Sequence, residues 1–300
     1  MNELSLIATL KRLCPSNDSV ILGIDDDAAV LRPSTREALV CTDMLMEGVH
    51  FLAEKAGARA VGRKALAVNL SDIAAMGGKA LSAFVALALP QDLAQASFIE
   101  DLYRGMTELA LEFDVAIAGG DTNIWTGPLV ITVTVVGEAH AKGPVLRSGA
   151  KVGDTIFVSG PLGGSILGHH LSFTPRLTLA RDLMNNFSVT SMLDISDGLA
   201  KDLREIIKQS RVSAYLNAES IPLNESIRHQ PDTLKAALCD GEDFELCFTL
   251  SPSEAARLLT NPHFANCRPI GTIQAGEGLY WDHDKSPIAW SGFEHRAPKG

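Results

Sequence analysis

The chain has 300 residues, of which 46% are hydrophobic and 21% charged, and these proportions exclude extended disorder for most of its length. The length suits one large or two ordinary domains, each with its own core. A formal net charge of −10 argues against a surface for nucleic acid or anionic membranes, unless bound divalent metals reverse the local charge.

The first half of the sequence alternates strand and helix patterns. Strands are expected where short apolar or β-branched runs occur, and helices where apolar residues recur at helical spacing. In chain order, the predicted elements are a strand at 38–42, a helix at 59–76 closed by the stop signal Gly77-Gly78, a strand at 81–89, a helix at 98–113 and a strand at 129–136.

The second half repeats this alternation after a linker rich in glycine and basic residues at 139–153. Its predicted elements are a strand at 155–158, a turn at 159–164 followed by a helix from Ser165, a strand at 192–195, a helix at 199–209 and a strand at 244–250. We therefore expect an α/β (α+β) protein with two domains, residues 1–145 and residues 146–300.

The cysteines and the apolar runs indicate the cellular compartment of the protein. The five cysteines form no Cys-x-x-Cys pair, which argues against a disulfide framework or a structural zinc site. The first 13 residues lack the basic and apolar regions of a signal peptide, and the longest apolar run, residues 80–89, is too short to span a bilayer. These features predict a cytoplasmic protein without a membrane segment.

Aspartates gather at strand ends and beside glycines instead of on solvated helix faces. The six clusters are GIDDDAA at 23–29, TD at 42–43, NLSD at 69–72, GGDT at 119–122, DISDG at 194–198 and DGED at 240–243. Magnesium takes oxygen ligands, usually a few carboxylates with water and substrate phosphates. Clustered carboxylates without a metal would repel and raise one another's pKa. The pattern therefore predicts Mg²⁺ ions that seat a polyphosphate for phosphoryl transfer.

Each carboxylate also has a structural interpretation. Asp25 and Asp26 read as solvated turn residues, so only Asp27 in that run is taken as a ligand. Asp43 could equally cap a helix or turn. Asp72 is harder to explain structurally, because a charge inside an apolar helix is costly unless it is paired or metal-bound. A single acidic site does not distinguish the structural interpretation from metal binding, whereas six sites with the same chemistry favour metal binding.

The familiar nucleotide-binding signatures are absent. The sequence contains no G-x-x-x-x-G-K-[ST], no G-x-G-x-x-G after a strand and no protein-kinase motif set. The turn from Gly160 to Ser165 could cradle a phosphate at a helix N-terminus, although such turns are more often plain connections. Arg147 could bind phosphate oxygens in a bidentate way or be a solvated linker charge, and a lone histidine such as His50 is more often structural.

Eight segments, taken in order, resemble the bacterial thiamine-monophosphate kinase family. They are GIDDDAAV, CTDMLMEGVHF, KALAVNLSDIAAMGG, AGGDT, LRSGAKVGD, SGPLGGS, DISDGLAKDL and DGEDFEL, and they run from about residue 23 to residue 248. The family belongs to the superfamily of aminoimidazole ribonucleotide synthetase and selenophosphate synthetase. GGDT and SDG are shared across that superfamily, whereas TDM-x₅-H and NLSD-x-AAMG are more specific.

The resemblance implies both a fold and a reaction. It implies an N-terminal mixed sheet with helices that forms a homodimer, and a C-terminal domain with helices packed on a sheet. It also implies Mg²⁺-dependent, direct in-line transfer of the γ-phosphoryl group of ATP to thiamine monophosphate, without a phosphoenzyme. ATP and thiamine monophosphate would lie in clefts near the dimer interface.

The site residues implied by the resemblance fall into four groups. Those matching metal positions are Asp27, Cys41, Thr42, Asp43, Asp72, Asp121, Asp194 and Asp197, with Cys41 expected to contribute its backbone oxygen because a thiol suits magnesium poorly. Those matching ATP positions are Tyr103, Gly120, Asp121, Arg147 and Ser196. Those matching substrate contacts are His50, Glu242 and Phe293, the last as an aromatic stacked on the thiamine. The catalytic electrostatics would come from Asp43, Asp121 and Arg147.

The sequence departs from the family pattern near the expected thiamine pocket. Asp240 stands where a glycine often precedes Gly241, Phe244 stands where tyrosine is common, and the tail GFEHR differs from the usual ending. The alternatives are another ATP-dependent member of the superfamily and a non-catalytic metabolite-binding protein. The chain lacks the reactive cysteine loop of selenophosphate synthetase and the cysteine-bearing tail of the hydrogenase-maturation dehydratase, and its full set of carboxylates argues against a non-catalytic protein.

Overall fold

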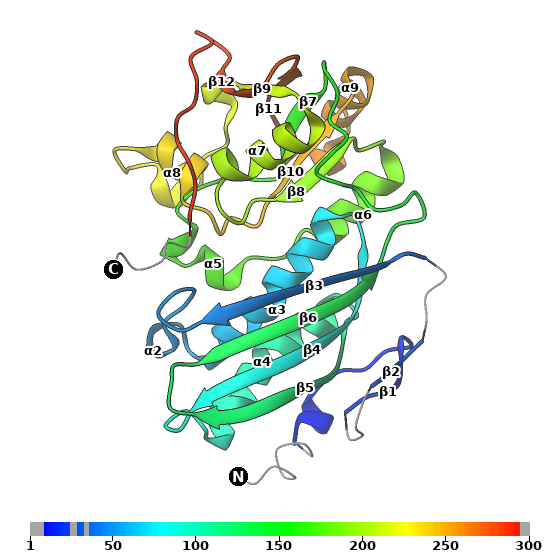
Figure 1. Ribbon diagram of the computed structural model, residues 1–300, viewed down its shortest axis with the longest axis vertical. Helices are drawn as coiled ribbons and strands as arrows, with labels where there is room; N and C mark the ends of the chain where they lie inside the picture. Colours follow the sequence, from blue (N-terminus) through cyan, green and yellow to red (C-terminus); the bar gives the residue numbers. More distant parts are fainter. Residues whose placement is uncertain (1–8, 25–28, 33–35, 295–300) are drawn as a thin grey trace. The chain divides into compact units, whose positions relative to one another are not determined.

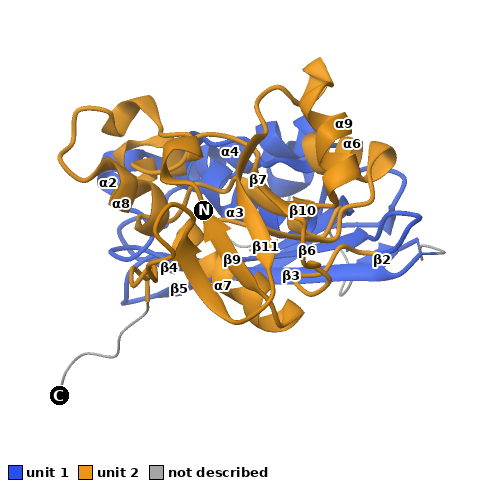
Figure 2. Cartoon of the chain, turned by 90° about the horizontal axis from the view of Figure 1, so that it is seen from above, with its two compact units in different colours: residues 1–73, 78–143, 171–177 blue, residues 74–77, 144–170, 178–300 orange. Residues whose placement is uncertain are grey.

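The computed structural model describes residues 9–24, 29–32 and 36–294 (Figure 1). The chain forms two compact units, each of mixed α/β structure, as expected for the fold class (Figure 2). Unit 1 comprises Met1–Ile73, Gly78–Gly143 and Leu171–Leu177, and unit 2 comprises Ala74–Gly77, Pro144–His170 and Thr178–Gly300. The return of residues 171–177 to unit 1 is fixed in part by Arg63, whose Nη2 donates to the carbonyl of Phe173 at 3.0 Å.

Unit 1 is built on a four-stranded sheet with the order β3-β6-β4-β5. The strands are β3 Ala38–Met46, β4 Lys79–Pro90, β5 Ala116–Trp125 and β6 Val130–Glu138, beside a hairpin of β1 Val20–Leu22 and β2 Val30–Leu31. The helices are α2 Ala53–Ala56, α3 Ala58–Ala75 and α4 Ala96–Glu112. β6 runs antiparallel to both neighbours, whereas β4 and β5 are parallel.

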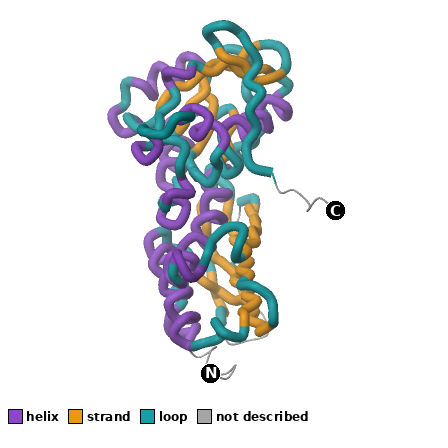
Figure 3. The backbone as a smooth tube through the Cα atoms, turned by 90° about the vertical axis from the view of Figure 1, so that its left-hand side faces the viewer, coloured by secondary structure: helices purple, strands orange, loops and turns teal. Residues whose placement is uncertain are grey.

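The helices of unit 1 lie on one side of its strands (Figure 3). α3 and α4 approach each other closely, because a Cβ added at Gly62 would lie 1.9 Å from the carbonyl oxygen of Leu102. The register places alternate residues of β3 on opposite faces of the sheet. Leu39 and Leu45 are buried, whereas Val40 and Met44 are 66% and 54% exposed. The sheet therefore has one face that is covered by helices and one face, the open face, that no helix among the described residues covers.

Unit 2 is built on a six-stranded sheet with the order β12-β9-β11-β7-β10-β8. Its strands are β7 Thr155–Val158, β8 Ser191–Asp194, β9 Ser213–Leu216, β10 Leu246–Leu250, β11 Arg268–Gln274 and β12 Gly278–Trp281. Helix α7, Leu199–Ser210, packs against β8, β12 and α8, and buries Leu199, Leu203 and Ile206 in the core.

The other helical elements of the second half are short. They are η1 Ser165–Leu167, α5 His169–Ser172, α6 Leu177–Asn186, η2 Ala218–Ser220, η3 Glu225–Ile227, α8 Thr233–Cys239, α9 Pro252–Leu259 and η4 Pro262–Phe264. Within the described residues, no helix combines the length and the apolar character needed to cross a membrane.

Most predicted elements are confirmed, with shifted ends, and two predictions need correction. The helix expected from Ser165 is wrong: a single 3₁₀ turn ends at Gly168, whose φ of 134° is outside the helical region. The segment AGGDT does not follow a strand but lies within β5, because β5 continues to Trp125 in register with β4.

Candidate functional site

Asp43 and Asp72 meet between β3 and α3. Asp43 lies on the helix-covered face of β3, and its backbone N–H donates to Oδ1 of Asn69 on α3 at 3.1 Å. The carboxyl group of Asp72 lies close enough to that of Asp43 to influence its pKa. The Cys41 thiol, on the same face, donates to the carbonyl of Asn69 at 3.3 Å. The structure thus brings three of the predicted metal residues together, whereas Asp27 lies outside the described residues.

The electrostatics of this pair suit a divalent cation. Burial raises the pKa of Asp43 above its ordinary value, and the hydrogen bond with Asp72 opposes that rise. Burial, followed by the charges of Asp72 and Asp43, raises the pKa of Cys41, so its sulfur stays a thiol and a poor magnesium ligand. Two adjacent carboxylates are a fitting oxygen donor set for Mg²⁺. Among the described residues, however, no three His, Cys, Asp or Glu side chains are arranged to hold a metal ion.

Thr42 and Asp121 lie on the open face of the same sheet. The Thr42 hydroxyl is 2.9 Å from that of Thr134 on β6. Asp121 pairs with the exposed Ala86 of β4, in the row that includes Met44 of β3. Its Oδ1 accepts the N–H of Thr122 at 2.8 Å, and its Oδ2 accepts Nδ2 of Asn123 at 2.9 Å.

Asp43 and Asp121 are therefore far apart within one chain. The pairing aligns Asp43, Val133, Val85 and Gly120 in one row across the four strands. Three strand spacings of about 4.8 Å separate the ends of that row by about 14 Å. Because the two carboxylates also lie on opposite faces, a single chain cannot place both on one ion.

Two predicted ATP residues of unit 1 have clear structural roles. A Cβ added at Gly120 would lie 1.9 Å from the carbonyl oxygen of Val85, so strand packing alone requires a glycine there. Tyr103 is only 3% exposed on α4, and burial raises the pKa of its phenol. The structure therefore places the Tyr103 ring in the core of unit 1.

His50 is held by its own neighbourhood. Its Nδ1 accepts the backbone N–H of Met46 at 3.0 Å, which puts the proton of the neutral ring on Nε2. The fully buried Lys64 of α3 donates from Nζ to the carbonyl of His50 at 2.7 Å. Sequence reasoning did not select Lys64 or Asn69. The available signal was the one that selected Asp72, a polar side chain inside an apolar helix.

In unit 2, the end of β8 and the loop after it carry three predicted residues. Asp194 is 7% exposed at the end of the strand, and Ser196 is exposed. The Asp197 carboxylate accepts Nζ of Lys201 at 2.6 Å, and its N–H donates to Asp202 at 3.0 Å. Burial, reinforced by the charges of Asp194 and Asp197, raises the pKa of Asp202 to about 7. This buried acid is a further residue that the sequence did not single out.

Phe293 lies on a C-terminal segment that is bound to α7. The N–H of Phe293 donates to the carbonyl of Asp197 at 2.8 Å, and its own carbonyl accepts Nζ of Lys201 at 2.7 Å. Arg204 of α7 donates to the carbonyls of Trp290, at 2.8 Å, and of Ile288. The structure thus brings the backbone of Phe293 next to Asp197 and leaves the residue 47% exposed.

The glycine turn at 160–165 is already occupied by carboxylates. The N–H of Gly163 donates to Oδ1 of Asp243 at 2.9 Å, and that of Gly164 to Oδ2 of Asp240 at 3.0 Å. The turn also precedes a 3₁₀ turn instead of a helix. The phosphate cradle considered for this turn is therefore not formed, because its donors bind the protein's own acids.

Arg147 is the predicted site residue that carries a guanidinium. Its side chain is exposed. Its loop is nevertheless fixed: Gly149 and Ala150 both donate to Oγ of Ser210 at 3.1 Å. A held backbone with an exposed guanidinium suits an anion-binding role.

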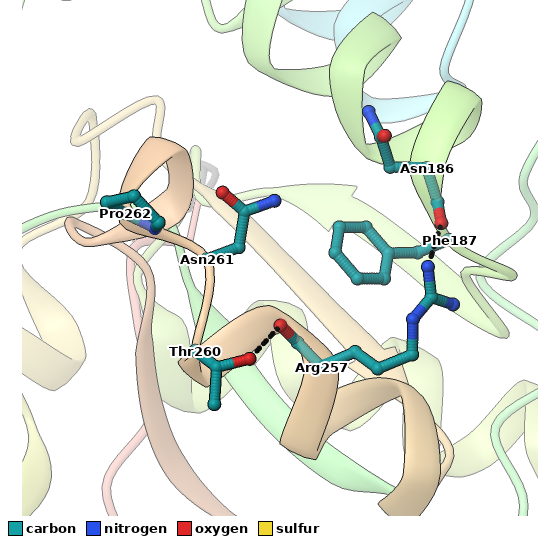
Figure 4. Close-up of a pocket in the computed structure, with 6 residues that line it drawn as sticks. All are labelled: Asn186, Phe187, Arg257, Thr260, Asn261 and Pro262. Atoms are coloured by element: carbon teal, nitrogen blue, oxygen red, sulfur yellow. Dashed lines mark hydrogen bonds between the residues drawn. The ribbon is translucent and has the colours of Figure 1, made fainter.

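A surface hollow in unit 2 contains none of the predicted site residues (Figure 4). It is lined by Asn186, Phe187, Arg257, Thr260, Asn261 and Pro262. Arg257 lies over the Phe187 ring at 5.3 Å, bonds Glu254 at 2.7 Å and donates to the carbonyl of Asn186 at 3.3 Å. Because its guanidinium is already paired, we do not assign the hollow to the active site.

The chain resembles known proteins over nearly its whole length. Residues 25–139 match the AIR synthase related protein, N-terminal domain, and residues 148–283 match the corresponding C-terminal domain. The thiamine-monophosphate kinase of Rhodopirellula baltica is 38% identical, over 99% of this chain and 96% of that protein.

Solved structures agree with that relationship. The thiamine-monophosphate kinase from Stenotrophomonas maltophilia K279a has a TM-score of 0.82 and 33% identity, over 94% of this chain and 96% of that one. AaThiL, solved in complex with AMPPCP and TMP, has a TM-score of 0.79 and 28% identity, over 98% of this chain and 97% of that one. This chain therefore belongs to the AIR synthase related family and, within it, to the thiamine-monophosphate kinases.

Proposed function

We propose that this protein transfers the γ-phosphoryl group of ATP directly to the phosphate of thiamine monophosphate, giving thiamine diphosphate. The observation that carries the proposal is the near full-length similarity to thiamine-monophosphate kinases, together with the half-buried pair of Asp43 and Asp72. The complex of AaThiL with AMPPCP and TMP supports ATP and thiamine monophosphate as the two substrates.

Magnesium is the metal that the donor set fits. Its charge would neutralise the phosphate oxygens between which the phosphoryl group passes. Asp43 and Asp72 are the ligands with the strongest geometric support, and Cys41 would add only its backbone oxygen. The other proposed ligands are Asp27, Thr42, Asp121, Asp194 and Asp197.

The chain's own residues would bind and orient the two substrates. The exposed guanidinium of Arg147 suits the triphosphate, with Ser196 and Gly120 as further ATP contacts, and Tyr103 remains a prediction without geometric support. For thiamine monophosphate we propose the Nε2–H of His50, Glu242 and the Phe293 ring. No general base is needed, because the acceptor phosphate is already an oxyanion.

We further propose a homodimer formed through the open face of the sheet in unit 1. That face carries Val40 and Met44 of β3, which are 66% and 54% exposed, and large exposed apolar side chains grouped on one face mark interaction surfaces. β3 and β5 are also the edge strands of this sheet. We propose a second copy as the occupant, because a symmetric contact would cover the exposed apolar side chains of both chains at once.

The first test is thiamine diphosphate formation from thiamine monophosphate and Mg-ATP. We expect product with the wild-type chain and a loss of at least about 100-fold with Asp43→Asn, because the amide cannot hold the cation. Asp101→Asn, on the surface of α4, makes the same chemical change away from the site and should leave activity unaltered. No product from the wild-type chain would refute the proposed reaction.

A further inference from the structure

The loop at 240–245 has an unusual backbone conformation. Glu242 and Phe244 have φ values of 55° and 50°, in the left-handed region that residues other than glycine seldom adopt. Such a conformation persists only where the surroundings hold it, and it is most often found at functional sites. In this loop, the two residues with that conformation directly precede and follow Asp243.

One side of this loop is bound to the segment after β8. The N–H of Glu242 donates to the carbonyl of Ser196, and the N–H of Phe244 donates to the carbonyl of Ile195, both at 2.8 Å. These bonds join the proposed substrate contact Glu242 to the backbone of the proposed ATP contact Ser196.

The other side of the loop is bound to the glycine turn at 160–165. Gly163 donates to Asp243, Gly164 donates to Asp240, and the Ser165 hydroxyl donates to the carbonyl of Glu242. The turn packs closely on α8, since a Cβ added at Gly163, where φ is 88°, would lie 2.7 Å from the backbone nitrogen of Ala237. Glu242 is therefore held between two segments of fixed position.

Asp243 is the buried member of this arrangement. It is 2% exposed, its Oδ1 accepts the Gly163 N–H, and its Oδ2 has no hydrogen-bond partner among the described residues. Burial is the main cause that raises the pKa of Asp243 to about 8; the charges of Glu245, Asp240 and Asp202 contribute to the rise, and the hydrogen bond from Gly163 opposes it. A buried carboxyl with one unsatisfied oxygen is a costly way to make a single hydrogen bond, so stability alone does not account for it.

We propose that Asp243 is a positioning residue, which uses its bond to Gly163 to hold Glu242 in the left-handed conformation that binds the phosphorylated acceptor. This inference rests on the proposed function, because it takes Glu242 as the substrate contact. The same inference gives a role to the SGPLGGS segment at 159–165. Through its bond to Asp243, this segment would hold the part of the site that binds the phosphorylated acceptor, and it would not bind a phosphate itself.

The test is steady-state kinetics of Asp243→Ala and Asp243→Asn. We expect Asp243→Ala to raise KM for thiamine monophosphate about tenfold while leaving kcat and KM for ATP within about twofold. Asp243→Asn keeps the shape and the acceptor oxygen, so it should restore KM to within about twofold of wild type. Asp232→Ala, an exposed position in unit 2 without a side-chain cap bond, is the matched control.

The possible outcomes have distinct meanings. A lower melting temperature of Asp243→Ala with an unchanged KM would show a merely structural role and overturn the proposal, as would equal KM increases in the alanine and asparagine variants. If Asp243→Ala does not fold, Ser165→Ala removes the bond to the Glu242 carbonyl and should raise the same KM about threefold; an unchanged KM would overturn the proposal. No turnover of thiamine monophosphate by the wild-type chain would refute the proposed function instead.

Discussion

Heterodimers with separated substitutions can determine whether one active site uses two chains. Asp43→Asn and Asp121→Asn can be placed either on different chains or together on one chain whose partner is wild type. Two affinity tags, one on each chain, allow pure heterodimers of both kinds to be isolated. Both kinds carry the same two substitutions, so they differ only in how the residues are distributed.

The expected magnitudes follow from the register of the sheet. Ions that flank one phosphoryl group lie about 4 Å apart and bind oxygens at about 2.1 Å, so their ligands fall within about 8 Å of one another. The backbones of Asp43 and Asp121 are about 14 Å apart in the sheet, and the side chains lie on opposite faces. If Asp43 and Asp121 serve one site, as proposed, that site combines Asp43 of one chain with Asp121 of the other.

Substitutions on different chains should then leave one intact site of two, and about half of the wild-type activity. Substitutions together on one chain should damage both sites and abolish activity. The assay is thiamine diphosphate formation with saturating Mg-ATP. The reverse pattern, activity only when both substitutions share a chain, would refute the shared site and the reasoning from strand register.

Three further predictions concern association and stability. Met44→Asp should give a folded monomer, because it places a charge on the open face; a dimer of wild-type mass in analytical ultracentrifugation would contradict the proposed interface. Gly62→Ala should lower the free energy of unfolding by at least about 2 kcal/mol in urea titrations, since its Cβ would overlap the Leu102 carbonyl; no change would mean that α3 and α4 separate freely. The pKa of Asp243 is raised to about 8 in the folded protein, whereas the unfolded chain releases this proton near the ordinary pKa of aspartate. The folded protein therefore binds a proton that the unfolded chain does not, and the contribution of Asp243 to stability declines as pH rises toward 8. The melting temperature of Asp243→Asn should therefore fall less between pH 5 and pH 8 than that of wild type, by on the order of 5 °C, and parallel curves by calorimetry would contradict the raised pKa.

Local patterns in the sequence were sufficient for much of the fold. The β-branched run at 129–136 and the apolar helix at 59–76 appear as β6 and α3, because hydrophobic periodicity reflects which residues an element can bury. The same logic singled out Asp72, since a carboxylate inside an apolar helix needs a compensating partner. The structure places a second acid, Asp43, beside it, and a cation bound there would compensate both charges.

The strand order could not be inferred from local patterns. The order β3-β6-β4-β5 differs from the order along the chain, and it decides that Asp43 and Asp121 lie in distant strands. Thr42 and Asp43 are neighbours in sequence, yet they lie on opposite faces, because successive residues of a strand alternate.

What the sequence by itself determined is the class of fold, the positions of most elements and the acidic clusters with their affinity for a hard cation. Only the tertiary structure decided which acids meet, and that the glycine turn at 160–165 binds Asp240 and Asp243 instead of a phosphate. The physical reason is that these contacts join segments up to 80 residues apart. Their formation depends on strand pairing and on long-range packing, which no short window of sequence contains.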